Sequence, residues 1–341
     1  MPEPDHSMAT DAGAPDSGQG PESEAATGWL AGVDEAGLGP VLGPLVVAGV
    51  TMVGPRGSDP WQLLADSISR DKHVRGKTRV ADSKKVFQGK RGLARLEQTV
   101  LTFWGALHDE LPATLAELLG SSEADLQLLG RCPWYTGLGL TLPLANERNS
   151  IELRAHTLRR TMASRGIEVR DIAIRAMDAA EFNASIAETN NKSDTHFRAY
   201  SEVIGRLLSG LSDDAHVVAD RCGGRIHYAP ALRRNLGSWR TSTLTEHPGL
   251  SAYEVTKDGQ KIKISFTPRG EDRSFPTALA SCAAKYVRQL MMTMLNDWFQ
   301  ERIPGLKRTA GYYVDGNRFL RDVERLVEDS PFPASLLVRC R

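Results

Sequence analysis

The pattern of apolar residues predicts an antiparallel pair of strands near the start of the folded chain. Residues 29–37 (WLAGVDEAG) and 44–53 (PLVVAGVTMV) are short apolar runs bounded by Gly and Pro. Runs of this length, rich in Val, favour strands over helices. A glycine-rich turn separates them, which predicts a hairpin at the beginning of a sheet.

Helical and strand patterns alternate further along the chain. Residues 80–107 indicate a loop that enters an amphipathic helix, residues 151–165 a helix, and residues 169–179 a strand. Behind a cap at Ser193 or Asp194, apolar residues recur at helical spacing at Phe197, Val203, Ile204, Leu207, Leu208 and Leu211. We expect this helix to pack one face on the sheet.

The second half of the chain repeats the alternation. Residues 215–220 predict a strand that ends at Asp220, and the pair Asp258 and Gly259 separates two alternating segments, which indicates a hairpin. Residues 269–299 predict a loop and a long helix that opens with small residues and can approach a sheet closely. The order of elements predicts an α/β fold, with antiparallel strands first and parallel strands after the crossover helix.

Composition divides the chain into three parts. Residues 1–28 are rich in Pro, Gly, Ser and Ala, carry six acids and no Lys or Arg, and predict a disordered acidic tail. The net charge of zero therefore hides a body with 42 basic and 36 acidic residues, which permits a polyanionic partner. We expect a main domain over residues 29–300 with an insertion at 109–165, and a C-terminal extension, 301–341, that packs on it.

The chain carries no sign of a membrane or secreted protein. No apolar run approaches the ~18 residues that a membrane span needs, and the N-terminus lacks the features of a signal peptide. The cysteines show no C-x-x-C spacing, which argues against a disulfide framework or a thiolate metal site. We expect a cytoplasmic protein, monomeric, with reduced cysteines.

Acidic residues stand at three points where a strand ends or a helix is about to begin. These points are Asp34 with Glu35, Asp220, and Glu271 with Asp272. If the strands that carry Asp34 and Asp220 are neighbours, their side chains converge at one edge of the sheet. Converging carboxylates bind hard cations such as Mg²⁺ or Mn²⁺ and are typical of phosphoryl transfer. Spacing alone leaves the alternative open that these are solvated surface acids, since the chain has 42 of them.

Several segments resemble, in order, the ribonuclease HII family. Residues 31–50 (AGVDEAGLGPVLGPLVVAGV) and 81–85 (ADSKK) are similar to the family's DEAGRGP, its second Gly-Pro and its DSK-K-L motif. Residues 217–224 (VVADRCGG) resemble its third strand, and residues 269–288 (RGEDRSFPTALASCAAKYVR) the segment that leads into A-A-S-I-x-A-K-V-x-R. AGYY at 310–313 is similar to its late Gly-Tyr. The resemblance covers most of residues 29–315.

This resemblance implies a ribonuclease H-like mixed sheet flanked by helices, with an inserted segment and a C-terminal helical extension. It implies a metal-dependent endonuclease that hydrolyses the RNA strand of RNA/DNA hybrids and leaves 3′-hydroxyl and 5′-phosphate ends. Asp34, Glu35 and Asp220 would be ligands of Mg²⁺ or Mn²⁺. The fourth carboxylate stays open: counting back from Ser281 gives Glu271, whereas counting from the Phe-Pro pair, and the residue type, give Asp272.

The resemblance also implies the residues that meet the substrate. A loop would contact the ribose 2′-hydroxyl, a second loop would contact phosphates, and an aromatic side chain would pack on the sugar. The corresponding residues are Gly37, Leu38 and Gly39 for the first loop, Ser83, Lys84 and Lys85 for the second, and Tyr312 for the aromatic.

One position departs from the family pattern. Leu38 stands where the family has the arginine of DEAGRGP, and an alkyl chain cannot replace a guanidinium at a phosphate. The alternative is therefore a nucleic-acid-binding protein, or a nuclease of different specificity, on the same scaffold. Retention of the acids favours the nuclease, since a pure binder gains nothing from negative charge clustered against a polyanion.

Overall fold

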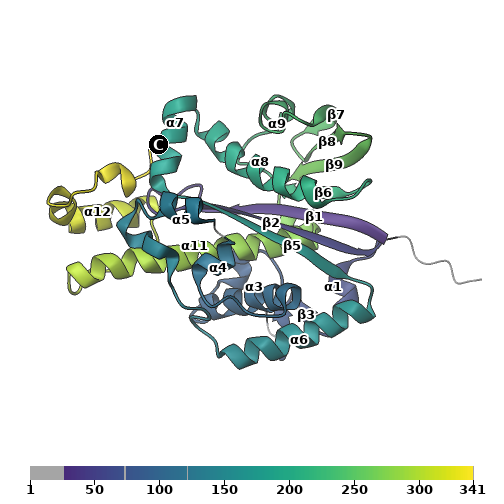
Figure 1. Ribbon diagram of the computed structural model, residues 1–341, viewed down its shortest axis with the longest axis horizontal. Helices are drawn as coiled ribbons and strands as arrows, with labels where there is room; N and C mark the ends of the chain where they lie inside the picture. The colour runs from purple at the N-terminus through teal and green to yellow at the C-terminus, as the bar shows by residue number, and fades with distance from the viewer. Residues whose placement is uncertain (1–26, 73, 121, 341) are drawn as a thin grey trace, which may run out of the picture.

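The structure, a computed structural model, describes residues 27–72, 74–120 and 122–340 (Figure 1). Its centre is a seven-stranded mixed sheet with the strand order β5-β2-β1-β6-β9-β8-β7. The sheet strands are β1 Thr27–Ala36, β2 Leu45–Pro55, β5 Glu168–Met177, β6 His216–Asp220, β7 Arg240–His247, β8 Leu250–Lys257 and β9 Gln260–Thr267, and β3 Ile68–Ser69 and β4 Thr78–Arg79 form a separate pair. Almost all of the predicted acidic tail, residues 1–26, lies outside the described residues.

The strand pairing confirms the predicted hairpins and the predicted mixture of directions. β1 pairs antiparallel with β2, and β8 with β9 around Asp258 and Gly259. β6 pairs in parallel with both β1 and β9, so the carboxyl ends of these three strands meet at one edge of the sheet. β7 was not predicted, because its residues are mostly polar and exposed and give no apolar alternation.

Helices cover both faces of the sheet, which confirms the predicted α/β class (Figure 1). α8 packs on β2 and β5 from one side, while α11 packs on β1 and β2 from the other, with α3 and α6 beneath it. The helical elements are α1 Pro60–Leu63, α2 Ser83–Val86, α3 Gly92–His108, α4 Leu115–Leu119, α5 Glu123–Leu129, η1 Pro133–Leu138, α6 Arg148–Ser164, α7 Ala179–Thr189, α8 Lys192–Gly210, α9 Ala229–Asn235, α10 Gly270–Arg273, α11 Phe275–Arg302, α12 Tyr313–Glu328 and η2 Ala334–Leu336. None of the helices in the described part of the chain has the length and apolar character that crossing a bilayer requires.

The first turn of α11 sits directly on the sheet. A Cβ at Gly32 of β1 would lie 2.0 Å from the backbone nitrogen of Thr277, so only glycine permits this approach. The Thr277 hydroxyl donates a hydrogen bond of 2.7 Å to the carbonyl of Val218 in β6. This contact fixes the start of α11 against the two strands that carry the central acids.

Segments from the predicted insertion and extension share one hydrophobic core with the sheet. Leu115 and Leu158, from the 109–165 segment, and Phe319 and Leu337, from the 301–341 segment, are buried in the core between the sheet and α11. The second core lies between the sheet and α8. Both segments therefore pack against the part of the chain that carries the acids.

The predicted cap of α8, Ser193 or Asp194, was wrong by two or three residues. Asn191 is the N-cap, because its backbone is extended and its side-chain oxygen accepts hydrogen bonds from the N–H groups of Ser193 and Asp194. The two predicted caps lie in the first turn instead.

Candidate active site

The adjacent acids of β1 point to opposite faces of the sheet. Successive side chains of a strand alternate, so Asp34 faces the layer of α11 and Glu35 the layer of α8. Ser281 of α11 lies beside Asp34, and the Tyr200 hydroxyl of α8 donates a hydrogen bond to Glu35 Oε2. The two carboxylates nevertheless remain close enough that the charge of Glu35 raises the pKa of Asp34.

β6 and the short helix α10 bring two further acids to Asp34. Val33 is the register partner of Ala219, so the next residues, Asp34 and Asp220, are neighbours at the carboxyl ends of parallel strands. The N–H of Gly270 donates a hydrogen bond of 2.9 Å to Asp220 Oδ1 and fixes the start of α10 beside it. Glu271 follows, 8% exposed, with Oε2 buried and without a hydrogen-bond partner among the described residues.

Burial raises the pKa values of these four carboxyl groups, and repulsion adds to the rise in Asp34, Glu35 and Glu271. Burial raises the pKa of Asp34 well above its usual range, and the charges of Glu35, Asp220 and Glu271 raise it further. Burial also raises the pKa of Glu35 to about 7, although the hydrogen bond from Tyr200 opposes the rise. The pKa values of Asp220 and Glu271 are raised mainly by burial. The cluster therefore carries more negative charge than its surroundings stabilise.

Asp272 and its neighbours are arranged differently. Its carboxylate lies 2.6 Å from the ammonium of Lys85, and this hydrogen bond lowers the pKa of Asp272. The structure therefore groups Glu271, and not Asp272, with Asp34 and Asp220. Lys84 is the nearby cation: burial lowers its pKa, but the charges of Asp82 and of the cluster raise it above its usual value.

The first predicted substrate loop lies beside the end of β1. Gly37 has φ of +95°, and a Cβ there would lie 2.4 Å from Arg288 Nε, so this position requires glycine. Gly39 is exposed, with no atom within 4 Å of the place where a Cβ would stand. Leu38 packs, half-buried, against the core on the α8 side.

The other predicted contacts border this loop and the cluster. The carbonyl of Gly311 accepts hydrogen bonds from the N–H groups of Val41 and Leu42, which places the half-exposed Tyr312 next to the glycine loop. Ser83 is buried, and its hydroxyl accepts a hydrogen bond of 2.9 Å from Ser281. The α2 loop is thereby joined to the helix that also contacts Asp34.

Sequence reasoning missed the residues that hold Glu35 from the α8 side. Tyr200 and His196 are fully buried, and His196 Nε2 lies 3.7 Å from Glu35 Oε1. Burial lowers the pKa of His196 to about 3, so the ring is neutral and forms no ion pair. Their spacing of four residues on the apolar face of a helix is that of ordinary core residues, so the sequence held no signal for them.

The carboxylate oxygens of the cluster are of the type that binds a hard divalent cation, but their present arrangement does not form a metal site. Carboxylate oxygens from three elements converge, and one of them, Glu271 Oε2, is buried without a partner. In the described part of the chain, however, no group of three His, Cys, Asp or Glu side chains is arranged to hold a metal ion as it stands. The hydrogen bond from Tyr200 holds Glu35 toward α8, and its release is one rearrangement that ligation by Glu35 would need.

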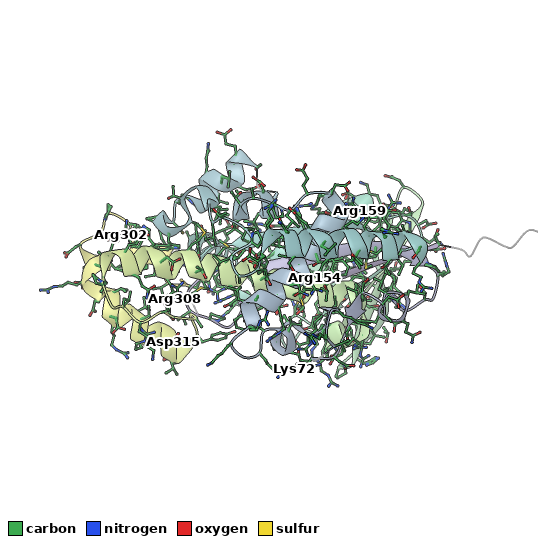
Figure 2. All side chains as sticks on the ribbon, turned by 90° about the horizontal axis from the view of Figure 1, so that it is seen from below. Lys72, Arg154, Arg159, Arg302, Arg308 and Asp315 are labelled. Atoms are coloured by element: carbon green, nitrogen blue, oxygen red, sulfur yellow. The ribbon has the colours of Figure 1, made fainter. Side chains whose placement is uncertain are left out.

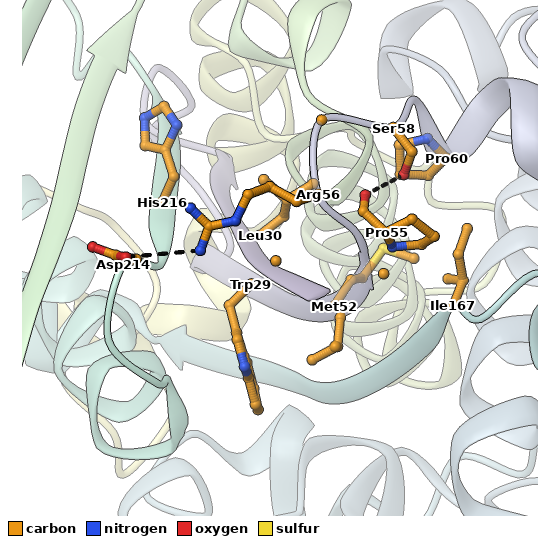
Figure 3. Close-up of a pocket in the computed structure, with 14 residues that line it drawn as sticks. Trp29, Leu30, Met52, Pro55, Arg56, Ser58, Pro60, Ile167, Asp214 and His216 are labelled. Atoms are coloured by element: carbon orange, nitrogen blue, oxygen red, sulfur yellow. Dashed lines mark hydrogen bonds and ion pairs between the residues drawn. The ribbon is translucent and has the colours of Figure 1, made fainter. Parts of the chain in front are cut away.

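A partly apolar hollow lies away from the acids. A cavity of about 190 Å³ is bordered by Trp29, Met52, Pro55 and Ile167, and by an Arg56 to Asp214 ion pair of 3.7 Å (Figure 3). It lies at the start of β1, whereas Asp34 lies near its end, roughly 15 Å away at ~3.3 Å per strand residue. The cavity is therefore separate from the carboxylate cluster.

Comparisons with known proteins give only distant structural likenesses. No protein-family model and no curated protein matches the chain. Among solved structures, the chain is similar to RNase HII of Archaeoglobus fulgidus, determined in complex with PCNA, with 16% identity over 92% of this chain and 94% of that one and a TM-score of 0.41. Its similarity to Bst-RNase HIII in complex with Mn²⁺ has 13% identity over 93% of this chain and 67% of that one, with a TM-score of 0.40. Its similarity to ribonuclease H2 from Pyrococcus horikoshii OT3 has 13% identity over 91% of this chain and 92% of that one, with a TM-score of 0.37. At these values no residue role is transferred from them.

Proposed function

We propose that the protein is a metal-dependent endonuclease of the ribonuclease HII type, which hydrolyses the RNA strand of RNA/DNA hybrids to 3′-hydroxyl and 5′-phosphate ends. The observation that carries the proposal is the convergence of Asp34, Asp220 and Glu271, with Glu35 beside them, next to an exposed glycine loop. The ordered sequence motifs of the ribonuclease HII family support the same assignment.

The four carboxylates would hold Mg²⁺ or Mn²⁺. Bound there, such ions activate the attacking water and stabilise the leaving oxygen in phosphoryl transfer. Asp34 and Asp220 are fixed at the ends of neighbouring strands, and Glu271 presents a free buried oxygen. Burial raises the pKa values of all four groups, and repulsion adds to the rise in Asp34, Glu35 and Glu271, which is the electrostatic reason to accept a cation.

The loops would orient the hybrid over these acids. The N–H groups of Leu38 and Gly39 have no hydrogen-bond partner among the described residues, and the absence of a Cβ at Gly39 leaves room for the backbone to approach a ribose. Tyr312 is half-exposed and borders the loop, where it can pack on a sugar. Lys84 would neutralise a phosphate beside the cluster, whereas Lys85 must first leave Asp272.

Leu38 favours a second candidate, a nuclease of the same scaffold with altered specificity. Its side chain packs on the core, so the exposed loop carries no guanidinium at this position. A lone ribonucleotide in DNA offers few contacts besides this loop. We therefore propose that a continuous hybrid is a better substrate than a duplex with one embedded ribonucleotide.

The test is cleavage of three 5′-labelled duplexes in Mg²⁺ or Mn²⁺: an RNA/DNA hybrid, a DNA duplex with one ribonucleotide, and DNA alone. The proposal expects cleavage of the hybrid, none of DNA, and loss of cleavage in Asp34→Asn. Equal cleavage of the first two duplexes would reject altered specificity. Binding of the hybrid without cleavage in either ion would reject the nuclease and leave a binding protein.

A further inference from the structure

Residues 335–340 lie against the glycine loop, residues 37–43, and we call them the strap. Val338 pairs with Leu42 in an isolated antiparallel bridge, and the N–H of Arg339 donates a hydrogen bond of 2.9 Å to the carbonyl of Val41. The Arg339 guanidinium donates through one nitrogen, Nη2, to the carbonyls of Gly37 and Pro40. Two residues of the strap, Val338 and Arg339, thus touch the loop that follows the central acids.

The strap is itself anchored to α7. The Asn183 side chain accepts a hydrogen bond of 2.7 Å from the N–H of Cys340 and donates to the carbonyls of Ser335 and Val338. The end of the described chain lies near α7 in Figure 1. The strap is therefore held from two sides, by the loop and by a helix.

Arg339 is an unusual residue to bury there. It is 3% exposed, and no carboxylate of the described residues forms an ion pair with it or with Arg288, the second guanidinium beneath the loop. Its Nε and Nη1 have no hydrogen-bond partner among the described residues, and its guanidinium lies 4.9 Å from the centre of the Phe182 ring. An unpaired buried charge costs stability, so packing alone does not explain an arginine at this position.

The bonds of Arg339 fix the direction of the loop backbone. They hold the carbonyls of Gly37 and Pro40 inward, and the intervening N–H groups of Leu38 and Gly39 stay free of internal acceptors. The exposed side of the loop, which has no basic side chain at position 38, would then offer backbone donors and the positive field of two guanidiniums behind them.

We propose that Arg339 is a positioning residue, which holds the glycine loop in the form in which the Leu38 and Gly39 N–H groups meet the nucleic acid. This role rests on the proposed function for its substrate, but not for the strap itself. An arginine in the loop would contact the nucleic acid directly. Arg339, distant in the chain, instead favours this contact by holding the loop backbone.

The test compares Arg339→Met, Arg339→Lys and Asn183→Ala with Arg302→Met as the control. Arg302 is partly exposed at the far end of α11 (Figure 2). Amide hydrogen exchange of residues 37–42 and KM and kcat for an RNA/DNA hybrid are measured for each. Loss of charge-assisted hydrogen bonds predicts that Arg339→Met raises loop exchange and KM by roughly 10-fold each while kcat changes less. In Arg339→Lys, loop exchange and KM should rise less than in Arg339→Met. In Asn183→Ala both quantities should lie between those of the wild type and Arg339→Met, and in Arg302→Met both should match the wild type.

Each other outcome is decisive. Unchanged loop exchange in Arg339→Met overturns the strap, and raised exchange with an unchanged KM overturns the positioning role. A drop in thermal stability alone, with KM as in the wild type, identifies Arg339 as purely structural. If the wild type cleaves no hybrid, the proposed function and the positioning role fail together. The exchange data still show whether Arg339 holds the glycine loop.

Discussion

Asp34 and Glu35, adjacent in β1, face opposite layers of the molecule: Asp34 lies beside Ser281 of α11, and Glu35 accepts a hydrogen bond from Tyr200 of α8. The alternation of a strand achieves this separation with no insertion or bulge. The two carboxylates share one sheet edge but not one environment. Their ionisation is nevertheless linked, because the charge of Glu35 raises the pKa of Asp34.

Glu35→Gln should stabilise the protein at alkaline pH. The pKa of Glu35 rises from 4.5 to about 7 on folding, so the folded state binds more protons than the unfolded state between these values, and stability falls as pH rises through this window. Gln is always neutral and keeps an acceptor for Tyr200. We expect Tm at pH 8 to increase by roughly 2 °C or more, and the difference to shrink toward pH 4.5.

Thermal melts of both proteins from pH 4.5 to 8.5, without divalent ions, provide the measurement. Glu301→Gln, at an exposed side chain on α11, is the matched control and should follow the wild type at every pH. A Glu35→Gln curve that runs parallel to the wild type would show that Glu35 titrates normally.

Glu271 and Asp272 should differ sharply in their effect on cleavage. Glu271 lies with the cluster and has a free buried oxygen, whereas Asp272 is held by Lys85 at 2.6 Å. We expect Glu271→Gln to lower kcat for an RNA/DNA hybrid by roughly 100-fold or more, and Asp272→Asn by less than about 3-fold. Single-turnover cleavage at saturating Mn²⁺ measures both, and the reverse order would make Asp272 the fourth carboxylate.

Divalent ions should stabilise the folded protein through the cluster. A ligand that binds only the folded state adds about 2.7 kcal/mol to the free energy of unfolding at 100 times its Kd. We expect Tm at pH 8 to rise with Mn²⁺ concentration in the wild type and in Asp272→Asn, and to lose most of this rise in Asp34→Asn. Calorimetry with a Na⁺ control at equal ionic strength tests this. A rise of equal size in all three proteins would place the bound ion elsewhere.

The sequence predicted those parts of the fold that local patterns encode. Val-rich runs around the glycine turn gave the β1/β2 hairpin, and the Asp258-Gly259 pair gave the β8/β9 hairpin, because turn chemistry and alternation are local. β7 was not predicted, because its polar exposed residues form a strand only by pairing with β8. Pairing of this kind leaves no periodic signal in the strand itself.

The same distinction applies to the site. The position of Asp34 and Asp220 at strand ends could be inferred, whereas the position of Asp272 apart from the cluster depends on its contact with Lys85, 187 residues away in the chain. Tyr200 and Arg339 reach the site from α8 and from the last residues of the chain, and neither lies in a recognisable motif. Contacts that join distant segments had to be seen in three dimensions.

Gly39→Ala should separate substrate contact from folding. No atom lies within 4 Å of its missing Cβ and its φ is not positive, so the free energy of unfolding should change by less than about 0.5 kcal/mol. A methyl group on the exposed loop would nevertheless keep the backbone from a ribose, and we expect kcat/KM for a hybrid to fall by roughly 10-fold. Gly139→Ala, also exposed and open, is the control, and it should alter neither quantity. Gly37→Ala should instead lose stability, because its φ is +95° and its Cβ would meet Arg288. Wild-type cleavage by a stable Gly39→Ala variant would show that this loop does not touch the substrate.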